Sequence, residues 1–299
     1  MKKITLLACC LMIAISVFSQ EKKRKASTYN KKKQEKGDVK FLEKQWWIGF
    51  KAGANTSKVN VTNRYSVVSP TNYELTDISK KYDNFGLIGS QATIEVSFYF
   101  KGFLLSFQPT YQHTRFSYTT HYEWASDGTT PQEINNNVML DYHQEQKIDY
   151  AVFPLLVKYD IAGNKLRPYV QAGIYSAMRL DATKTLSTSG VDYAAGGENE
   201  FKTETIDVGV DDLFAKYHWG LLGGVGVNYN FKNHVRLNLD VMYKLGMSNI
   251  TSTENRYGSD RLAGVGDAMD DMKLDNLSVS IGCLFPLRFL QSSLQTLDH

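Results

Sequence analysis

The sequence is poor in cysteine and, after its first 18 residues, lacks any long hydrophobic run. No later segment approaches the roughly 20 apolar residues that a transmembrane helix needs, so the exported chain is expected either to be soluble or to cross a membrane as strands. Two of the three cysteines, Cys9 and Cys10, lie in the N-terminal leader. Cys283 then remains alone, which excludes an intrachain disulfide, and it is expected to be a small apolar side chain on a strand.

The sequence also lacks the residue groupings typical of catalysis or metal binding. Histidines are dispersed along the chain at His113, His121, His143, His218 and His234. No pair has the spacing of metal ligands, and His121 and His143, near Glu123 and Asp141, are expected to be solvated in a polar loop. The aspartates between Asp260 and Asp275 do not match the spacing of an EF-hand and are also expected to be solvated. We therefore predict no catalytic, cofactor-binding or metal site.

The first 19 residues have the features of a secretory signal peptide. Two lysines precede an apolar run from Ile4 to Phe18, and Val17 and Ser19 occupy the positions that a signal peptidase inspects. We predict cleavage after Ser19. A lipoprotein interpretation, with Cys9 in a lipobox-like Leu-Leu-Ala-Cys, would leave too short an apolar segment, because signal sequences contain roughly 7–15 such residues.

Residues 20–45 form a strongly basic segment. Between Glu21 and Lys44, ten basic residues accompany four acidic ones, with almost no apolar periodicity. Such a segment cannot bury enough surface to fold, so a disordered periplasmic tail is expected. It is either an electrostatic tether to acidic lipid headgroups, peptidoglycan or a partner protein, or a solvated spacer.

From Trp46 onward, apolar and polar residues alternate with the period of β-strands. The segment 235–248 is the clearest case, because its odd positions are apolar or tyrosine whereas Arg236, Asn238 and Asp240 alternate with them. Gly163-Asn164 favours a hairpin turn between two such segments. Eight strands are predicted, at residues 46–58, 85–98, 103–118, 148–160, 166–182, 213–230, 235–248 and 273–289.

The connections between these strands alternate between short and long. Residues 99–102, 161–165 and 231–234 are short connections, whereas 59–84, 119–147, 183–212 and 249–272 are each longer than twenty residues. A soluble sandwich would also alternate, but four successive long polar connections at one end would be unusual for it. Lipid does not tolerate unpaired strand edges, which requires the sheet to close.

The predicted fold is therefore all-β, an eight-stranded antiparallel up-and-down transmembrane β-barrel over residues 46–289. Aromatic residues near the ends of the apolar faces fit interfacial girdles. Short periplasmic turns, long extracellular loops, two periplasmic termini and a C-terminal tail at 290–299 complete this prediction, which locates the protein in the cell outer membrane.

Three motifs lie in the first, fourth and fifth predicted strands. They are Gly49-Phe-Lys-Ala-Gly-Ala-Asn55, Phe153-Pro-Leu-Leu-Val-Lys-Tyr159 and Leu166-Arg-Pro-Tyr-Val-Gln-Ala-Gly173. With this order of motifs, residues 46–289 resemble the PorT-like outer-membrane β-barrel family of Gram-negative bacteria. The resemblance implies an outer-membrane barrel and, through the family's namesake, a component of type IX secretion. It implies no catalytic residue.

The interior of an eight-stranded barrel is just wide enough for side chains to fill it, which argues against a water-filled pore for large solutes. The alternation places eight charged residues inside: Lys51, Glu95, Lys158, Arg179, Lys216, Arg236, Asp240 and Lys244. Buried charges must pair or stay hydrated, so they form either a hydrogen-bonded plug or, because six are basic, an anion site. The glycines between Gly220 and Gly226 resemble a phosphate loop, but no helix follows, and they are expected to allow curvature and interior packing.

The resulting hypothesis is a non-enzymatic outer-membrane barrel that acts as a binding or scaffold module of the cell envelope. The alternatives are a PorT-like component of a type IX secretion machine and an outer-membrane barrel enzyme. The expected partners are outer-membrane lipid and envelope or secretion-system proteins, without nucleic acid and without a cofactor; the sequence does not identify a ligand. Tyrosines in the long connections suit protein contact: Tyr65, Tyr73, Tyr82, Tyr118, Tyr122, Tyr142 and Tyr193.

Overall fold

The computed structural model describes residues 44–65, 80–100, 102–124, 138–161, 165–193, 197–231, 235–256 and 268–287. The predicted signal peptide, nearly all of the basic tail and the predicted C-terminal tail lie outside the described residues. No helix among those residues is long and apolar enough to cross a membrane.

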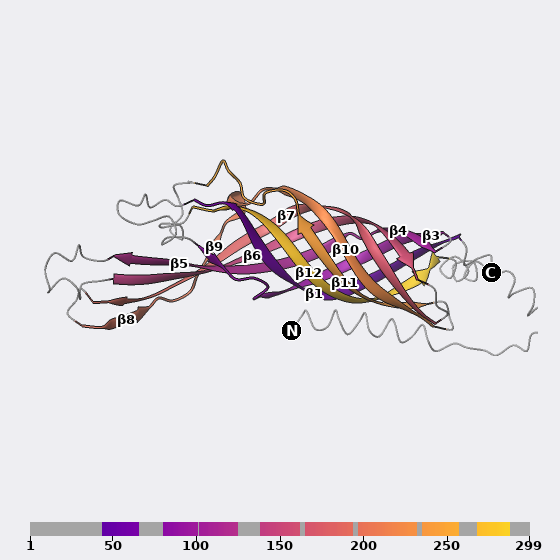
Figure 1. The fold of residues 1–299 in the computed structure, drawn as a ribbon, viewed down its shortest axis with the longest axis horizontal. Coiled ribbons are helices and arrows are strands. Elements are labelled where there is room, and N and C mark those ends of the chain that lie inside the picture. The colour runs from indigo at the N-terminus through magenta and orange to yellow at the C-terminus, as the bar shows by residue number, and fades with distance from the viewer. Residues whose placement is uncertain are drawn as a thin grey trace, which may run out of the picture. The chain divides into compact units, whose positions relative to one another are not determined.

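Eight strand positions close into a ring in which every neighbouring pair is antiparallel (Figure 1). The strands of the ring are β1 (Lys44–Asn63), β3 (Ile88–Phe100), β4 (Phe103–Phe107), β5 (Thr110–Trp124), β6 (Val138–Asp160), β7 (Leu166–Asp192), β10 (Tyr217–Asn230), β11 (Arg236–Gly246) and β12 (Asp271–Pro286). β4 and β5 share one position, and the pairing of β1 with β12 closes the ring. The predicted eight-stranded up-and-down barrel is confirmed.

The break between β4 and β5 has a local cause. Pro109 has no backbone N–H and cannot donate to a neighbouring strand, although its carbonyl still accepts a hydrogen bond from the Ile94 N–H at 3.0 Å. The single strand predicted for residues 103–118 is therefore divided into two pieces, both of which pair with β6.

Alternating side chains give the barrel two different faces. On β1, Lys51 and Asn55 point inward and are buried, whereas Phe50, directly before Lys51, is 59% exposed on the outside. Exposed apolar residues continue around the ring through Ile94, Trp219 and Ile281. The outer surface is thus apolar and the inner surface mainly polar, which reverses the usual arrangement of a water-soluble protein.

Aromatic rings pair on the outer surface beside the short turns. Ring centroids lie 5.1 Å apart for Trp46 and Phe98, 4.9 Å for Phe103 and Tyr159, and 5.0 Å for Tyr229 and Phe231. This placement matches the predicted girdle at one edge of the apolar band. Between Phe100 and Phe103, Gly102 adopts a φ of 92°, which a tight turn requires.

At the other end, three strands run on past the strands that close the barrel. Thr114–Trp124 of β5, Val138–Ile148 of β6 and Ala182–Asp192 of β7 remain paired with each other, and β8 (Asn199–Lys202) and β9 (Ile206–Gly209) add to β7. We call this extension the blade; its strands lie at the left of Figure 1. The short β2 (Lys81–Tyr82) pairs with its root.

The blade occupies much of what the sequence predicts as the long loops 119–147 and 183–212. Its residues include Thr, Tyr and Val, which suit strands, but the blade lacks the clean alternation of apolar and polar residues that marks a strand with one buried face. The predicted strands are therefore too short on the side of the blade. β5 continues beyond residue 118, β6 begins before residue 148 and β7 continues beyond residue 182.

Candidate functional site

A network of buried charges crosses the barrel interior. Lys51 Nζ lies 2.8 Å from Glu95 Oε2 and 2.6 Å from Asp240 Oδ2, while Lys158 Nζ lies 2.7 Å from Glu95 Oε1. These four side chains are at most 2% exposed and come from β1, β3, β6 and β11. Because a buried charge is costly unless it is paired, the four residues depend on one another.

Neutral donors complete the coordination of the two carboxylates. Ser106 Oγ donates to Glu95 Oε1 at 3.0 Å, and the Tyr169 hydroxyl donates to Asp240 Oδ2 at 3.2 Å. Asn238 Nδ2 in turn donates to the Tyr169 hydroxyl at 2.7 Å. The network thereby reaches β4 and β7 as well, so hydrogen bonds tie opposite walls of the barrel together.

An aromatic and cationic layer lies beside the network, toward the short turns. The Arg236 guanidinium carbon is 3.9 Å from the centroid of the Trp47 ring and 5.6 Å from that of Tyr99. Trp47 and Tyr99 form a buried cluster with Leu104 and Leu284. This layer fills the interior at that end of the barrel with rings and aliphatic side chains.

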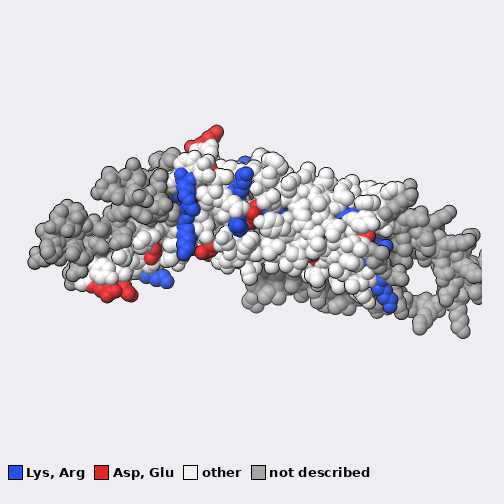
Figure 2. All heavy atoms as spheres, in the orientation of Figure 1, with Lys and Arg blue, Asp and Glu red and all other residues white. Residues whose placement is uncertain are grey.

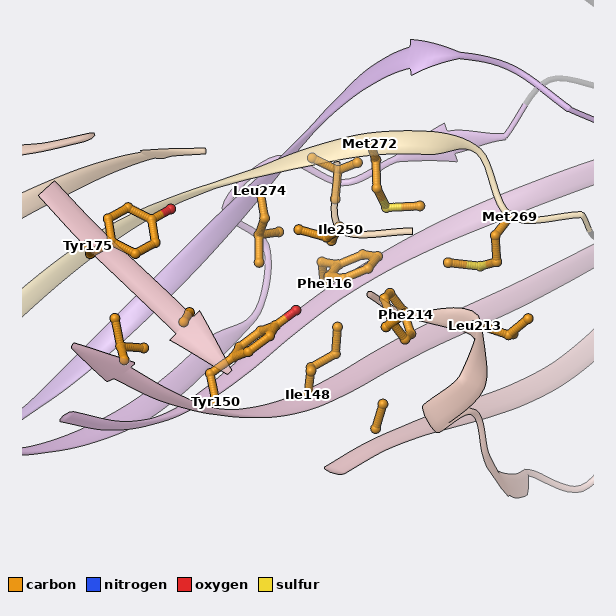
Figure 3. Close-up of a cluster of buried hydrophobic side chains, with 14 of the residues drawn as sticks. Phe116, Ile148, Tyr150, Tyr175, Leu213, Phe214, Ile250, Met269, Met272 and Leu274 are labelled. Atoms are coloured by element: carbon orange, nitrogen blue, oxygen red, sulfur yellow. The ribbon is translucent and has the colours of Figure 1, made fainter. Parts of the chain in front are cut away.

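The opposite end of the interior, at the root of the blade, is apolar. Figure 3 shows Phe116, Ile148 and Phe214 converging with residues from the connecting segments. Among the latter, Leu213 and Phe214 lie in or just after the 3-10 helix η2 (Asp211–Leu213), and Ile250 and Met269 come from the last long connection. We call this cluster the apolar plug. Ile250 and Met269 come from the predicted loop 249–272 and were not expected inside the barrel. Leu213 and Phe214 were predicted to begin a strand at residue 213, but β10 begins only at Tyr217.

Two of the eight predicted interior residues are not enclosed with the others inside the barrel. Lys216 is exposed and lies one residue before β10 begins, so its side chain is not enclosed by the barrel. Arg179 lies where an irregularity in the β6–β7 register interrupts the alternation, and it pairs with Asp211 at the rim. Lys244 is buried inside, where its ammonium donates to Gln112 Oε1.

The histidines occupy separate positions on the β5–β6 wall and inside the barrel. His113 Nδ1 lies 2.6 Å from Asp149, and His121 Nδ1 lies 2.8 Å from Asp141, both as cross-strand pairs. His143 contacts Thr119 and Ser189 on the blade. His218 is buried between two tyrosines, and His234 lies outside the described residues. No group of three or more potential metal ligands occurs in the part of the chain that the structure describes.

Three aspartates expected to be solvated are instead buried and hydrogen-bonded near the rim of the barrel. Asp270 accepts hydrogen bonds from the Tyr82 hydroxyl at 2.9 Å and from Lys80. Asp275 accepts from Asn60, Tyr243 and the Gly246 N–H. These bonds join β1, β11 and β12 just where the strands leave the apolar band.

Asp271 is the third of these aspartates. Its carboxylate accepts hydrogen bonds from Asn63 at 3.1 Å and Asn249 at 3.0 Å and pairs with Arg256. Partial burial opposes ionisation, but these donors and the guanidinium outweigh it and hold the pKa of Asp271 below its usual value. The ionised carboxylate of Asp271 therefore stabilises the rim of the barrel.

Comparison with solved structures gives small outer-membrane barrels at low identity. AlkL in lipid bilayers is 14% identical with a TM-score of 0.37, covering 90% of this chain and 96% of its own. Neisserial surface protein A is 12% identical with a TM-score of 0.32, covering 80% and 95%. The outer membrane protease OmpT from Escherichia coli is 11% identical with a TM-score of 0.29, covering 81% and 95%. No curated protein matches the chain significantly.

A family match covers most of the chain. The outer membrane protein beta-barrel domain matches residues 18–252, which include β1 through β11. The match agrees with the closed ring, the apolar outer surface and the polar interior described above. The chain therefore belongs to the outer membrane protein β-barrel domain family, which supports a location in the outer membrane.

Proposed function

We propose that this protein is a non-enzymatic binding or scaffold module of the cell envelope, which presents the blade to partners outside the cell. The observation that carries the proposal is the contrast between the two parts of the sheet. Inside the ring, the charged network and the apolar plug fill the interior, whereas the blade extends three paired strands beyond the ring.

The filled interior argues against transport of large solutes. Buried apolar side chains at the blade end and paired charges farther in leave no wide aqueous path through the described residues. Eight-stranded barrels have interiors that side chains can fill completely. The protein is then expected to act by binding at its surfaces and not by transport through the barrel.

The blade has the surface chemistry of a protein-contact site. One face carries the exposed pair His121 and Asp141 and the exposed contact between Thr119 and His143. On β8 and β9, Phe201 and Ile206 are exposed. Mixed aromatic, aliphatic and hydrogen-bonding groups of this kind are typical of protein interfaces. We therefore place the binding surface on the blade.

The enzyme alternative is weakened by the separation of the relevant side chains. The carboxylate of Asp141 pairs with His121, whereas the hydroxyls of Thr119 and Ser189 contact His143. Nucleophilic catalysis needs a histidine base that contacts both the nucleophile and an orienting carboxylate. Within the described blade, neither His121 nor His143 makes both contacts. Hydrolysis of peptide or lipid by the purified protein, abolished by His121→Ala or His143→Ala, would favour an enzyme instead.

A shortened blade tests the binding role. Thr120 and Tyr142 are cross-strand partners, so replacing residues 121–141 with Asn-Gly should close a tight hairpin at that point. Proteins crosslinked to the surface of intact cells should be captured with the wild-type protein and lost with this variant, while both reach the outer membrane equally. Equal capture by both proteins would contradict a binding role for the blade tip.

The second candidate is a PorT-like component of a secretion machine, which the motifs of residues 49–55, 153–159 and 166–173 favour. Its distinguishing segment is the basic tail rather than the blade. Deletion of residues 21–44 would then remove stoichiometric envelope partners during purification, whereas shortening the blade would leave them bound. Unchanged partners after the tail deletion would argue against this candidate.

A further inference from the structure

A small cavity lies inside the barrel among side chains of β5, β6, β7, β10, β11 and β12. It has a volume of about 10 Å³, and its polar lining consists of Gln112, Tyr150, Tyr175, His218, Lys244 and Asn276. A space of this volume admits one water-sized guest. A monoatomic ion can occupy it, but a phosphate or sulfate cannot.

Lys244 brings an unbalanced positive charge to this cavity. Its side chain is buried, and its ammonium donates to Gln112 Oε1. Asp240, on the same face of β11, is four residues away, about 13 Å along a strand, and its carboxylate pairs with Lys51. No carboxylate lies within ion-pair distance of Lys244 among the residues that the structure describes.

The count of buried charges agrees with this local picture. Seven basic side chains are buried among the described residues: Lys51, Lys80, Lys158, Lys184, Arg236, Lys244 and Arg256. Six carboxylates are buried with them: Glu95, Asp160, Asp240, Asp270, Asp271 and Asp275. One positive charge is therefore in excess, and an isolated buried charge is strongly destabilising unless an opposite charge accompanies it.

Two further donors face the same cavity without a partner. The Tyr150 hydroxyl and His218 Nδ1 are buried and make no hydrogen bond with the described residues. Their rings pack edge to face with centroids 4.6 Å apart. Buried polar groups are nearly always hydrogen-bonded, so both point to a guest in the cavity. A histidine protonated at Nδ1 and a tyrosine hydroxyl can both donate to an anion.

We propose that this cavity is a binding site for a single halide ion, with chloride the expected occupant, held by Lys244, Tyr150 and His218. The ion balances the excess charge and accepts hydrogen bonds from all three side chains. Asn276 Oδ1 also lacks a partner, and because it is an acceptor, a single water molecule is the competing occupant. The lining also includes Val152 and Leu274 of the apolar plug.

Refolding in different salts tests this site independently of the function proposed for the blade. The full chain is refolded into detergent micelles in sodium chloride or sodium gluconate at equal ionic strength, and Tm is measured by circular dichroism. A ligand that binds only the folded state raises Tm with its concentration. Tm should therefore increase with chloride but not with gluconate.

Variants locate the effect within the cavity. Lys244→Met should abolish the chloride dependence, and Tyr150→Phe should raise the half-saturating chloride concentration about tenfold, because a hydrogen bond to a charged group is lost. Lys216→Met is the matched control, since Lys216 is exposed at the rim, and it should retain the full chloride dependence.

Two results would overturn the proposal. The first is an equal Tm of the wild-type protein in both salts, which would identify the guest as water. The second is a chloride dependence that survives in Lys244→Met. If Lys244→Met does not refold, crystals grown with bromide decide the matter, since an anomalous peak beside Lys244, Tyr150 and His218 supports the site and its absence refutes it.

Discussion

The ammonium of Lys51 on β1 lies 2.6 Å from a carboxylate oxygen of Asp240 on β11, although 189 positions separate the two residues in the chain. Lys51 also pairs with Glu95 at 2.8 Å. Removing its charge would leave both carboxylates short of a partner. We expect Lys51→Met to lower the free energy of unfolding by about 3–5 kcal/mol, as is typical for breaking a buried ion pair.

Urea titration of the protein in lipid vesicles measures this loss for Lys51→Met. Lys216→Met is again the control, because exposed substitutions usually change the free energy of unfolding by less than about 0.5 kcal/mol. If Lys51→Met were as stable as this control, the network would not contribute to the stability of the barrel.

The apolar plug predicts a barrel without a large conductance. Phe214 is buried among Phe116, Ile148 and Ile250, where the interior meets the root of the blade (Figure 3). In planar bilayers the wild-type protein should show no conductance or only a small one. Phe214→Ala should destabilise the protein by about 3–5 kcal/mol by creating a cavity, without opening a wide channel because the charged network remains. Large, stable channels in the wild-type protein would refute the filled interior.

The rim carboxylate of Asp271 predicts a loss of stability in acid. Because its folded-state pKa is depressed below an unfolded value of about 3.9, the ionised group contributes stability that is present above that value. This contribution is lost as the pH falls through the lowered folded-state pKa. The difference in Tm between wild type and Asp271→Asn should therefore be largest above about pH 5 and shrink toward pH 2.

Thermal unfolding at several pH values, followed by circular dichroism, gives this difference directly. Glu204→Gln serves as the control, since Glu204 is exposed between β8 and β9 and should give no such pH-dependent difference. A constant difference between wild type and Asp271→Asn across the whole range would contradict the role assigned to the rim carboxylate.

Alternation along the strands was enough to predict the ring and the inward direction of several charges. Lys51, Glu95, Lys158 and Asp240 each occupy the polar face of a regular strand, and the structure brings their side chains into contact. The functional role of these residues stays a prediction. Which charges meet could not be predicted, because it depends on the register of β1, β3, β6 and β11 around the closed ring.

Residues at register shifts and in the connecting segments could not be placed from the alternation of apolar and polar residues. The pairing of β6 with β7 shifts between Asp149 and Tyr150, directly beside the pair that Tyr150 forms with Arg179. Arg179 pairs with Asp211 and not with the charged network. The apolar plug includes Ile250, which comes from a predicted loop, and Leu213, which lies before β10 and not in the predicted strand 213–230. Its presence explains why residues 152–157 are apolar on both sides, since Val152 and Leu156 face the interior cluster while Phe153 and Leu155 are exposed outside.

Gly226 on β10 leaves room for the Tyr169 side chain inside the barrel. A Cβ at this position would collide with the ring and hydroxyl of Tyr169 and lie 2.8 Å from the Leu239 carbonyl oxygen. The Tyr169 hydroxyl also donates to Asp240 in the charged network. We expect Gly226→Ala to destabilise the barrel by about 1–3 kcal/mol, the usual range for overpacking.

Gly223 provides the matched control on the same strand. The nearest atom to a Cβ added there is the Gln171 carbonyl oxygen at 3.9 Å. Gly223→Ala should therefore be neutral or stabilise the protein by up to about 1 kcal/mol, since alanine reduces the freedom of the unfolded chain. Urea titrations of both variants in lipid vesicles measure the contrast. Equal effects of the two substitutions would show that the lost glycine flexibility, and not the displacement of Tyr169, determines the cost at Gly226.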